Sequence, residues 1–91
     1  MTAPYLGNPK KTIEVLQKYD FVFQKKYGQN FLIDTHVLDK IINAAEITEE
    51  DFVLEIGPGI GTMTQYLASR AREVFAVEID RALIPILEDT L

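Results

Sequence analysis

The sequence contains no cysteine among its 91 residues, so it can form neither a disulfide nor a thiolate metal site. Histidine is nearly absent as well, and the single residue His36 cannot form a metal site alone. We therefore predict no bound metal. No apolar run approaches the ~18 residues of a membrane span, and the N-terminus lacks the pattern of a signal peptide. A cytoplasmic protein without membrane contact is the expectation.

Positive charge is scarce over most of the chain, which argues against a general nucleic-acid binder. The formal net charge is −5. Residues 1–30, however, carry five lysines against Glu14 and Asp20, whereas residues 31–91 carry four basic and twelve acidic groups. We interpret residues 1–28 as a basic N-terminal arm with a short helix. Such an arm either lies solvated and poorly ordered, which we favour on charge alone, or faces a phosphate backbone.

Hydrophobic periodicity divides the chain into helices and strands. Proline and glycine mark residues 1–11 as an irregular lead-in, and from Thr12 onward Ile13, Leu16 and Tyr19 share one helical face. The full prediction, in chain order, is a helix from Thr12 to Lys18–Asp20, a helix at 35–45, a strand at 52–56, a helix from Thr62 to Arg70, a strand at 73–80 and a helix at 81–91.

Polar residues mark the predicted helix starts. Asp34 is a suitable N-cap for the helix that follows it. Thr62 and Gln65 have the spacing of a capping box, in which each side chain bonds the other's backbone amide. Asp80 is a suitable N-cap for the last helix, which tolerates Pro85 only in its first turn unless it kinks there.

The order helix, strand, glycine loop, helix, strand, helix predicts an α/β fold, the first part of a doubly wound, Rossmann-like domain with N-terminal helices. The strand at 52–56 is apolar on both faces except at Glu55, as in a buried parallel strand. Two parallel strands form an incomplete sheet, because each needs neighbours and covered faces. We therefore expect residues 29–91 to be the N-terminal part of a larger domain, or the isolated chain to pair with a second copy through its open sheet edge.

The glycine-rich stretch after the first strand carries the strongest chemical signal. Gly57, Gly59 and Gly61 follow a strand and open a helix, where glycine allows positive φ and lets a ligand approach the backbone closely. The dinucleotide fingerprint G-x-G-x-x-G would place its third glycine at position 62, which is Thr62. The observed G-x-G-x-G is typical of S-adenosylmethionine-dependent methyltransferases of the doubly wound class, and it disfavours an NAD-dependent dehydrogenase.

An acidic residue follows at the distance that a ribose contact requires. Glu78 lies at the end of the second predicted strand, where a carboxylate can accept two hydrogen bonds from a ribose diol. We prefer Glu78 to Asp80, its rival, because Asp80 suits a helix cap. We interpret Glu55 as a structural acid.

Three stretches together resemble one family. "GQNFLID", "VLEIGPGIGTMT" and "VFAVEID", in this order and spacing, are similar to those of the ribosomal RNA adenine dimethyltransferases, above all the bacterial small-subunit type whose loss gives kasugamycin resistance. The resemblance covers about residues 12–91. It implies a class I methyltransferase domain that uses S-adenosylmethionine to dimethylate two adjacent adenosines near the 3′ end of small-subunit ribosomal RNA, with that RNA or a precursor of the 30S subunit as partner.

The resemblance also implies a cofactor site, with Gly57 and Gly59 along the methionine part, Glu78 at the ribose and Ile79 on the adenine. The full implied set is Asn30, Leu32, Gly57, Gly59, Glu78 and Ile79. The family's Asn-Leu-Pro-Tyr motif, which holds the target amine, has no counterpart in these 91 residues. We therefore name no catalytic residue and expect this chain alone to be inactive.

Two kinds of relative remain as alternatives. Erythromycin-resistance methyltransferases, which modify a large-subunit adenine, share the Gln-Asn-Phe-Leu and glycine motifs, but "GPG" and the lead-in "TIEVLQKYDFVFQKKYG" favour the small-subunit type. A nucleic-acid-binding transcription factor that keeps the fold without catalysis would suit the basic arm. The intact glycine loop and Glu78 weigh against a lost cofactor site.

Overall fold

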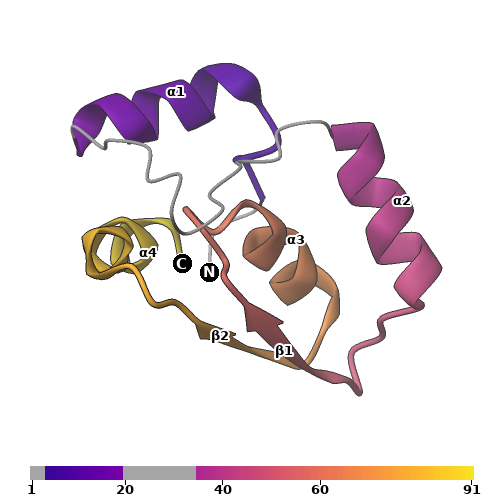
Figure 1. Cartoon of the computed structure of the whole chain (residues 1–91). Coiled ribbons are helices and arrows are strands. Elements are labelled where there is room, and N and C mark those ends of the chain that lie inside the picture. Colours follow the sequence, from indigo (N-terminus) through magenta and orange to yellow (C-terminus); the bar gives the residue numbers. More distant parts are fainter. Residues whose placement is uncertain (1–3, 20–34) are drawn as a thin grey trace.

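The computed structural model describes residues 4–19 and 35–91, whose arrangement is shown in Figure 1. The elements, in chain order, are α1 (Pro9–Lys18), α2 (Thr35–Ala45), β1 (Phe52–Ile56), α3 (Thr62–Arg70), β2 (Glu73–Val77), the 3-10 helix η2 (Arg81–Leu83) and α4 (Ile84–Thr90). Within these residues, no helix is both long and apolar enough to cross a membrane.

β1 and β2 form the sheet, and α3 connects them along the chain. The strands pair in parallel, with Leu54 opposite Phe75 and Ile56 opposite Val77. Both lie where the sequence predicted them, although β2 ends at Val77 rather than at Asp80. The part of the chain that the structure describes holds these two strands in one sheet, so the predicted incomplete α/β sheet is confirmed.

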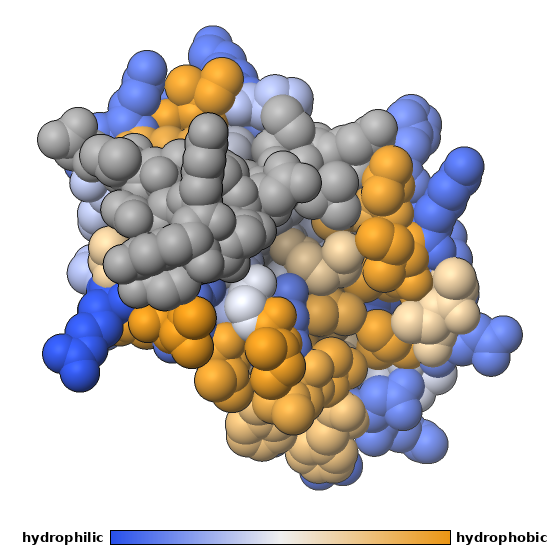
Figure 2. All heavy atoms as spheres, in the orientation of Figure 1, coloured by the Kyte–Doolittle hydropathy of each residue, from blue (hydrophilic) through white to orange (hydrophobic). Residues whose placement is uncertain are grey.

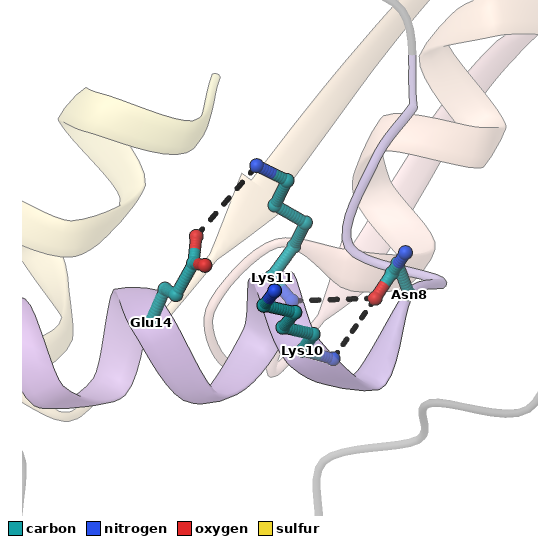
Figure 3. A network of polar contacts seen from close by, with 4 residues as sticks. All are labelled: Asn8, Lys10, Lys11 and Glu14. Atoms are coloured by element: carbon teal, nitrogen blue, oxygen red, sulfur yellow. Dashed lines mark hydrogen bonds and ion pairs between the residues drawn. The ribbon is translucent and has the colours of Figure 1, made fainter.

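Helix α1 begins at Pro9, earlier than predicted. Asn8 is its N-cap, because the Asn8 Oδ1 accepts hydrogen bonds from the backbone amides of Lys10 at 2.9 Å and Lys11 at 3.4 Å (Figure 3). Proline suits the first helical turn, where its missing amide hydrogen leaves no helical bond unmade. The interpretation of residues 1–11 as an irregular lead-in is therefore wrong from Pro9 onward.

The N-terminal segment contributes to the hydrophobic core. Leu6 is fully buried together with side chains from the glycine loop and the C-terminal helical region, and partly buried side chains from residues 5–19 pack against this cluster. The buried members are Leu6, Ile60, Leu83 and Ile86, and those packed against them are Tyr5, Val15, Leu16 and Tyr19. The described part of the segment thus packs against the core along one side, while the residues on its other side are exposed. The predicted domain division at residue 28 lies outside the described residues and stays a prediction.

The inward face of α1 differs in one position from the prediction. Ile13, expected on this face, is 53% exposed, and Thr12 is buried beside it. The Thr12 hydroxyl donates to the Leu6 carbonyl at 2.9 Å, so the buried polar group is satisfied. The periodicity of apolar residues alone could not predict the burial of Thr12, because that burial depends on a hydrogen bond to the Leu6 carbonyl, which lies outside the helix.

Helix α2 spans Thr35–Ala45, as predicted. Leu38 and Ile42 are buried, whereas Ile41 is 42% exposed, so only part of the apolar face of α2 is covered. The Arg70 guanidinium, at the end of α3, donates to the Asn43 side-chain oxygen at 3.0 Å and links the two helices. The predicted cap of α2, Asp34, lies outside the described residues.

Helix α3 does not begin with the predicted capping box. Gly61 is the N-cap, at a φ of 95°, and makes no side-chain cap bond, so Thr62 is the first helical residue instead of the cap. The Gln65 side chain is engaged elsewhere, because its Oε1 accepts bonds from the amides of Tyr5 and Leu6, both at 3.0 Å. The prediction is wrong because distant partners take the side chain that the local spacing had assigned to the cap.

The C-terminal helical region follows the predicted rules. The Asp80 Oδ1 accepts a bond from the Ala82 amide at 2.9 Å and caps η2, and Pro85 falls in the first turn of α4. On the outer side of α4, Lys18 Nζ at 2.6 Å and the Tyr19 hydroxyl at 2.5 Å both donate to Asp89 Oδ2. These two bonds join α1 to α4.

One face of the sheet carries exposed apolar side chains, which we call the open sheet face. Its members, each half exposed or more, are Phe52, Leu54 and Ile56 of β1 and Phe75 and Val77 of β2. Figure 2 shows apolar surface gathered in the lower part of the molecule, where Figure 1 places the two strands. The expectation of a strand buried on both faces is therefore wrong for β1, because the described residues leave this face uncovered.

Candidate functional site

The glycine loop, residues 57–61 between β1 and α3, is shaped by its backbone. Gly57, Gly59 and Gly61 have φ values of 72°, 63° and 95°, a region that residues with a Cβ rarely adopt. The Gly57 amide donates to the Val77 carbonyl at 2.8 Å, and the Gly61 amide donates to the Pro58 carbonyl at 3.0 Å. The loop is therefore tied to the end of β2 and closed by its own turn.

Glu78 follows β2 directly and holds the glycine loop through its carboxylate. Its Oε1 accepts a hydrogen bond from the Gly59 amide at 3.1 Å, and its Oε2 accepts one from the Asp80 amide at 3.0 Å. A carboxylate offers about four acceptor positions, so these two bonds leave about two for a ligand. A Cβ added at Gly57 would meet nothing within 4 Å, so the backbone there is open to a ligand.

The structure brings together three of the predicted cofactor residues: Gly57, Gly59 and Glu78. Ile79, the next residue after Glu78, is 72% exposed and offers an apolar side chain close to that carboxylate along the chain. Asn30 and Leu32 lie outside the described residues, so their predicted contacts stay predictions. Within the described ranges 4–19 and 35–91, no group of three or more histidine and acidic side chains is placed to hold a metal ion.

Glu55 joins the sheet to α3. Its Oε1 accepts a hydrogen bond from the hydroxyl of Thr64, which lies on that helix. Burial raises the pKa of the Glu55 carboxyl, and the bond from Thr64 lowers it in part. The contact supports the interpretation of Glu55 as a structural acid.

Sequence reasoning missed the burial of three polar side chains near the glycine loop, those of Thr62, Gln65 and Thr90. The Thr90 hydroxyl donates to the Ile60 carbonyl at 2.8 Å, and the Gln65 Nε2 donates to the Thr90 carbonyl at 2.9 Å. Thr62 is 5% exposed, and its hydroxyl oxygen has no hydrogen-bond partner among the described residues. No local signal could have found the Gln65 and Thr90 bonds, because the residues they join are 25 and 30 positions apart.

A family model described as "Ribosomal RNA adenine dimethylase" matches residues 20–91. The chain belongs to this family. It is 77% identical over 88 residues to "Ribosomal RNA small subunit methyltransferase A" of Lachnoclostridium phytofermentans. The aligned region covers 96% of this chain and 30% of that protein. It is 56% identical over 86 residues to the protein of the same name from Alkaliphilus oremlandii, and the aligned region covers 94% of this chain and 30% of that protein.

The crystal structure of a dimethyladenosine transferase from Plasmodium falciparum is similar in fold. The TM-score is 0.58 at 41% sequence identity, over 62% of this chain and 21% of that one. This likeness confirms the predicted fold class, a Rossmann-like methyltransferase fold with an incomplete sheet. The chain spans about 30% of the length of the curated relatives that it matches.

Proposed function

We propose that this chain is the cofactor-binding portion of an S-adenosylmethionine-dependent ribosomal RNA adenine N6,N6-dimethyltransferase. The observation that carries the proposal is the hydrogen bond between the Gly59 amide and the Glu78 carboxylate, which holds an acid beside the glycine loop. In open α/β sheets, ligands bind outside the carboxyl ends of the strands, where these residues lie. The relatives named "Ribosomal RNA small subunit methyltransferase A" support small-subunit ribosomal RNA as the substrate.

The proposed target is the exocyclic amine of two adjacent adenosines, in that RNA or in a precursor of the 30S subunit. S-adenosylmethionine supplies an electrophilic methyl group when bound. The adenine amine is a poor nucleophile, because its lone pair is conjugated with the ring, so the base has to be flipped and the amine oriented. We assign that task to none of the described residues and propose that the chain alone is inactive. A ribosomal RNA substrate also supports a cytoplasmic location.

The described residues fit this cofactor through three features. The Glu78 carboxylate retains acceptor positions for the ribose hydroxyls, since within residues 4–19 and 35–91 two backbone amides are bonded to it. The open space at Gly57 lets the methionine part approach the backbone, and the exposed Ile79 offers apolar contact for the adenine. We further propose that Asn30 and Leu32 contact the cofactor.

The test uses a grafted enzyme, in which this chain replaces the matching segment of the 77% identical relative. We expect the grafted enzyme to bind S-adenosylmethionine in isothermal titration calorimetry and to methylate 30S particles. Methylation of 23S RNA instead would favour the erythromycin-resistance type. RNA binding without cofactor binding would favour the non-catalytic relative.

Replacing Glu78 tests the residue that carries the proposal. In the grafted enzyme, Glu78→Gln exchanges one acceptor oxygen for a donor amide and removes the charge, so we expect the cofactor affinity to fall about tenfold or more. The matched control is Glu73→Gln, the same change at an exposed position of β2, which should leave the affinity unchanged. Equal affinities of the two variants would remove Glu78 from the site.

The isolated chain has a separate expected behaviour. We propose that it binds the cofactor weakly or not at all, and that it associates with a second copy at the open edge of the two-stranded sheet, beside the exposed apolar side chains. Size-exclusion chromatography with light scattering should show a dimer or larger species. A compact, cooperatively folding monomer would contradict the association, and micromolar cofactor binding in calorimetry would contradict the first expectation.

A further inference from the structure

Gln65 is a fully buried amide that links two distant parts of the chain. Its Oε1 accepts hydrogen bonds from the backbone amides of Tyr5 and Leu6, both at 3.0 Å. Its Nε2 donates to the carbonyl of Thr90, at the end of α4, at 2.9 Å. One side chain of α3 thus satisfies backbone groups of both the N-terminal segment and α4, groups that burial would otherwise leave unpaired.

Thr90 carries this connection onward to the glycine loop. Its hydroxyl donates to the Ile60 carbonyl at 2.8 Å, and Thr90 is 2% exposed. The Ile60 side chain is fully buried in the same core cluster as Leu6. Four buried or partly buried hydrogen bonds therefore run from the backbone of Tyr5 and Leu6, through Gln65 and Thr90, to the middle of the loop.

The glycine loop is consequently held from two sides. On the side of the candidate site, Glu78 bonds the Gly59 amide and the Val77 carbonyl accepts from Gly57. On the interior side, Thr90 bonds the neighbouring Ile60 carbonyl. A loop of three glycines has much conformational freedom to lose, so each fixed peptide group contributes to holding one ligand-ready arrangement.

We propose that Gln65 and Thr90 are positioning residues for the cofactor loop, and that the N-terminal segment, residues 4–19, acts on the cofactor site through them. The proposal rests on the proposed function, because the loop matters only where it binds the cofactor. The match to the family model covers residues 20–91 and does not include this segment. Gln65 and Thr90 act by fixing the Ile60 peptide, without contact to the cofactor or to the reacting atoms.

The decisive variant is Thr90→Val in the grafted enzyme. Valine keeps the shape of threonine and its backbone carbonyl, so the bond to Gln65 is retained while the donor to Ile60 is removed. We expect the KM for S-adenosylmethionine to rise about tenfold, with the KM for RNA unchanged. Thr90→Ser restores the hydroxyl and is expected to return the cofactor KM to within about twofold of the unchanged graft.

A matched control separates positioning from general destabilisation. Thr64→Val removes a comparable buried hydroxyl, whose hydrogen bond goes to the Glu55 carboxylate and neither to the loop nor to the N-terminal segment. Both variants should lower the melting temperature, but only Thr90→Val should raise the cofactor KM. If Thr90 were merely structural, its variant would lose active enzyme and hence apparent kcat, while the KM for the cofactor stayed constant.

A second measurement needs no variant to fold. Coupling between two sites is reciprocal, so a segment that orders the cofactor loop must itself be ordered further by the cofactor. Hydrogen exchange of the unchanged graft should show slower exchange at the amides of Tyr5 and Leu6 when S-adenosylmethionine is added. Unchanged exchange there, or an unchanged cofactor KM in Thr90→Val, would overturn the positioning role while the proposed function stands. Failure of the unchanged graft to bind the cofactor would overturn both.

Discussion

Replacing Gly61 by alanine tests the packing that holds the glycine loop. The added Cβ would lie 2.8 Å from Thr90 Oγ1, 3.3 Å from a methyl carbon of Leu91 and 3.4 Å from a methyl carbon of Leu87. A contact under 3.0 Å requires a shift, so the Thr90 hydroxyl has to move. Because that hydroxyl donates to the Ile60 carbonyl at 2.8 Å, the movement breaks a buried hydrogen bond.

The expected cost has two parts. The φ of 95° at Gly61 disfavours any residue with a Cβ, which costs about 1–2 kcal/mol. Overpacking against the end of α4, with loss of the Thr90 bond, adds about 1–3 kcal/mol. Gly61→Ala should therefore destabilise the fold by about 2–5 kcal/mol.

Gly57→Ala is the matched control on the same loop. Its φ of 72° carries the same kind of backbone cost, but the added Cβ would meet nothing within 4 Å, so only about 1–2 kcal/mol is expected. The lower chain entropy of alanine in the unfolded state acts equally in both variants and cancels in their difference. The difference of about 1–3 kcal/mol corresponds to at least about 2 °C in melting temperature.

The assay is thermal unfolding of both variants of the grafted enzyme, without cofactor, so that direct effects on ligand binding do not enter. Gly61→Ala should melt below Gly57→Ala. Equal melting temperatures would show that backbone conformation alone decides the cost. A lower melting temperature for Gly57→Ala would refute the packing of the loop against α4.

Three further predictions concern the stability of the grafted enzyme. Leu6→Ala should destabilise it by about 2–5 kcal/mol because Leu6 is fully buried, whereas Ile13→Ala, at a 53% exposed position, should cost about 0.5 kcal/mol; similar losses in urea denaturation would contradict the core position of Leu6. Asn8→Ala should cost about 0.5–2 kcal/mol through loss of the α1 cap, and Asn8→Asp should retain most of that stability in the same assay. Burial raises the pKa of Glu55, so its contribution to stability is present below its ordinary pKa of 4.5 and lost as the pH rises through the raised folded value. Glu55→Gln should therefore raise the melting temperature near neutral pH but not at a pH below that ordinary pKa. An equal rise in melting temperature at both pH values would argue against burial as the cause.

The local rules of sequence succeeded where the structure uses local interactions. The strand at 52–56 and the helix at 35–45 were predicted from periodicity, and the cap at Asp80 from its position before the last helix. Gly57, Gly59 and Glu78 were predicted from spacing to lie close together, and the bond between Gly59 and Glu78 shows that proximity, whereas their binding of a cofactor stays a prediction. Parallel strands place their carboxyl ends at one edge, which is why spacing along the chain sufficed.

Local rules failed where two of them competed or where the partner was distant. Asn8 and Pro9 form a helix start, but the prolines and glycine of the lead-in favoured a loop. Thr62 and Gln65 had the spacing of a capping box, yet Gly61 already occupied the cap with a positive φ. Gln65 bonds amides 59 and 60 residues away, and no pattern along the chain records such a contact.

The apolar pattern of the strands needs a different interpretation from that of the helices. Leu54 and Phe75 are paired neighbours on the two strands, as are Ile56 and Val77, and each of the four is at least half exposed. A strand that is apolar on both faces requires other elements to cover both faces, and the described residues leave one face of this sheet uncovered. Contiguous apolar patches of this kind mark surfaces that another element or chain covers. The same residues that made the fold class predictable from sequence are thus the ones whose burial the described part of the chain leaves incomplete.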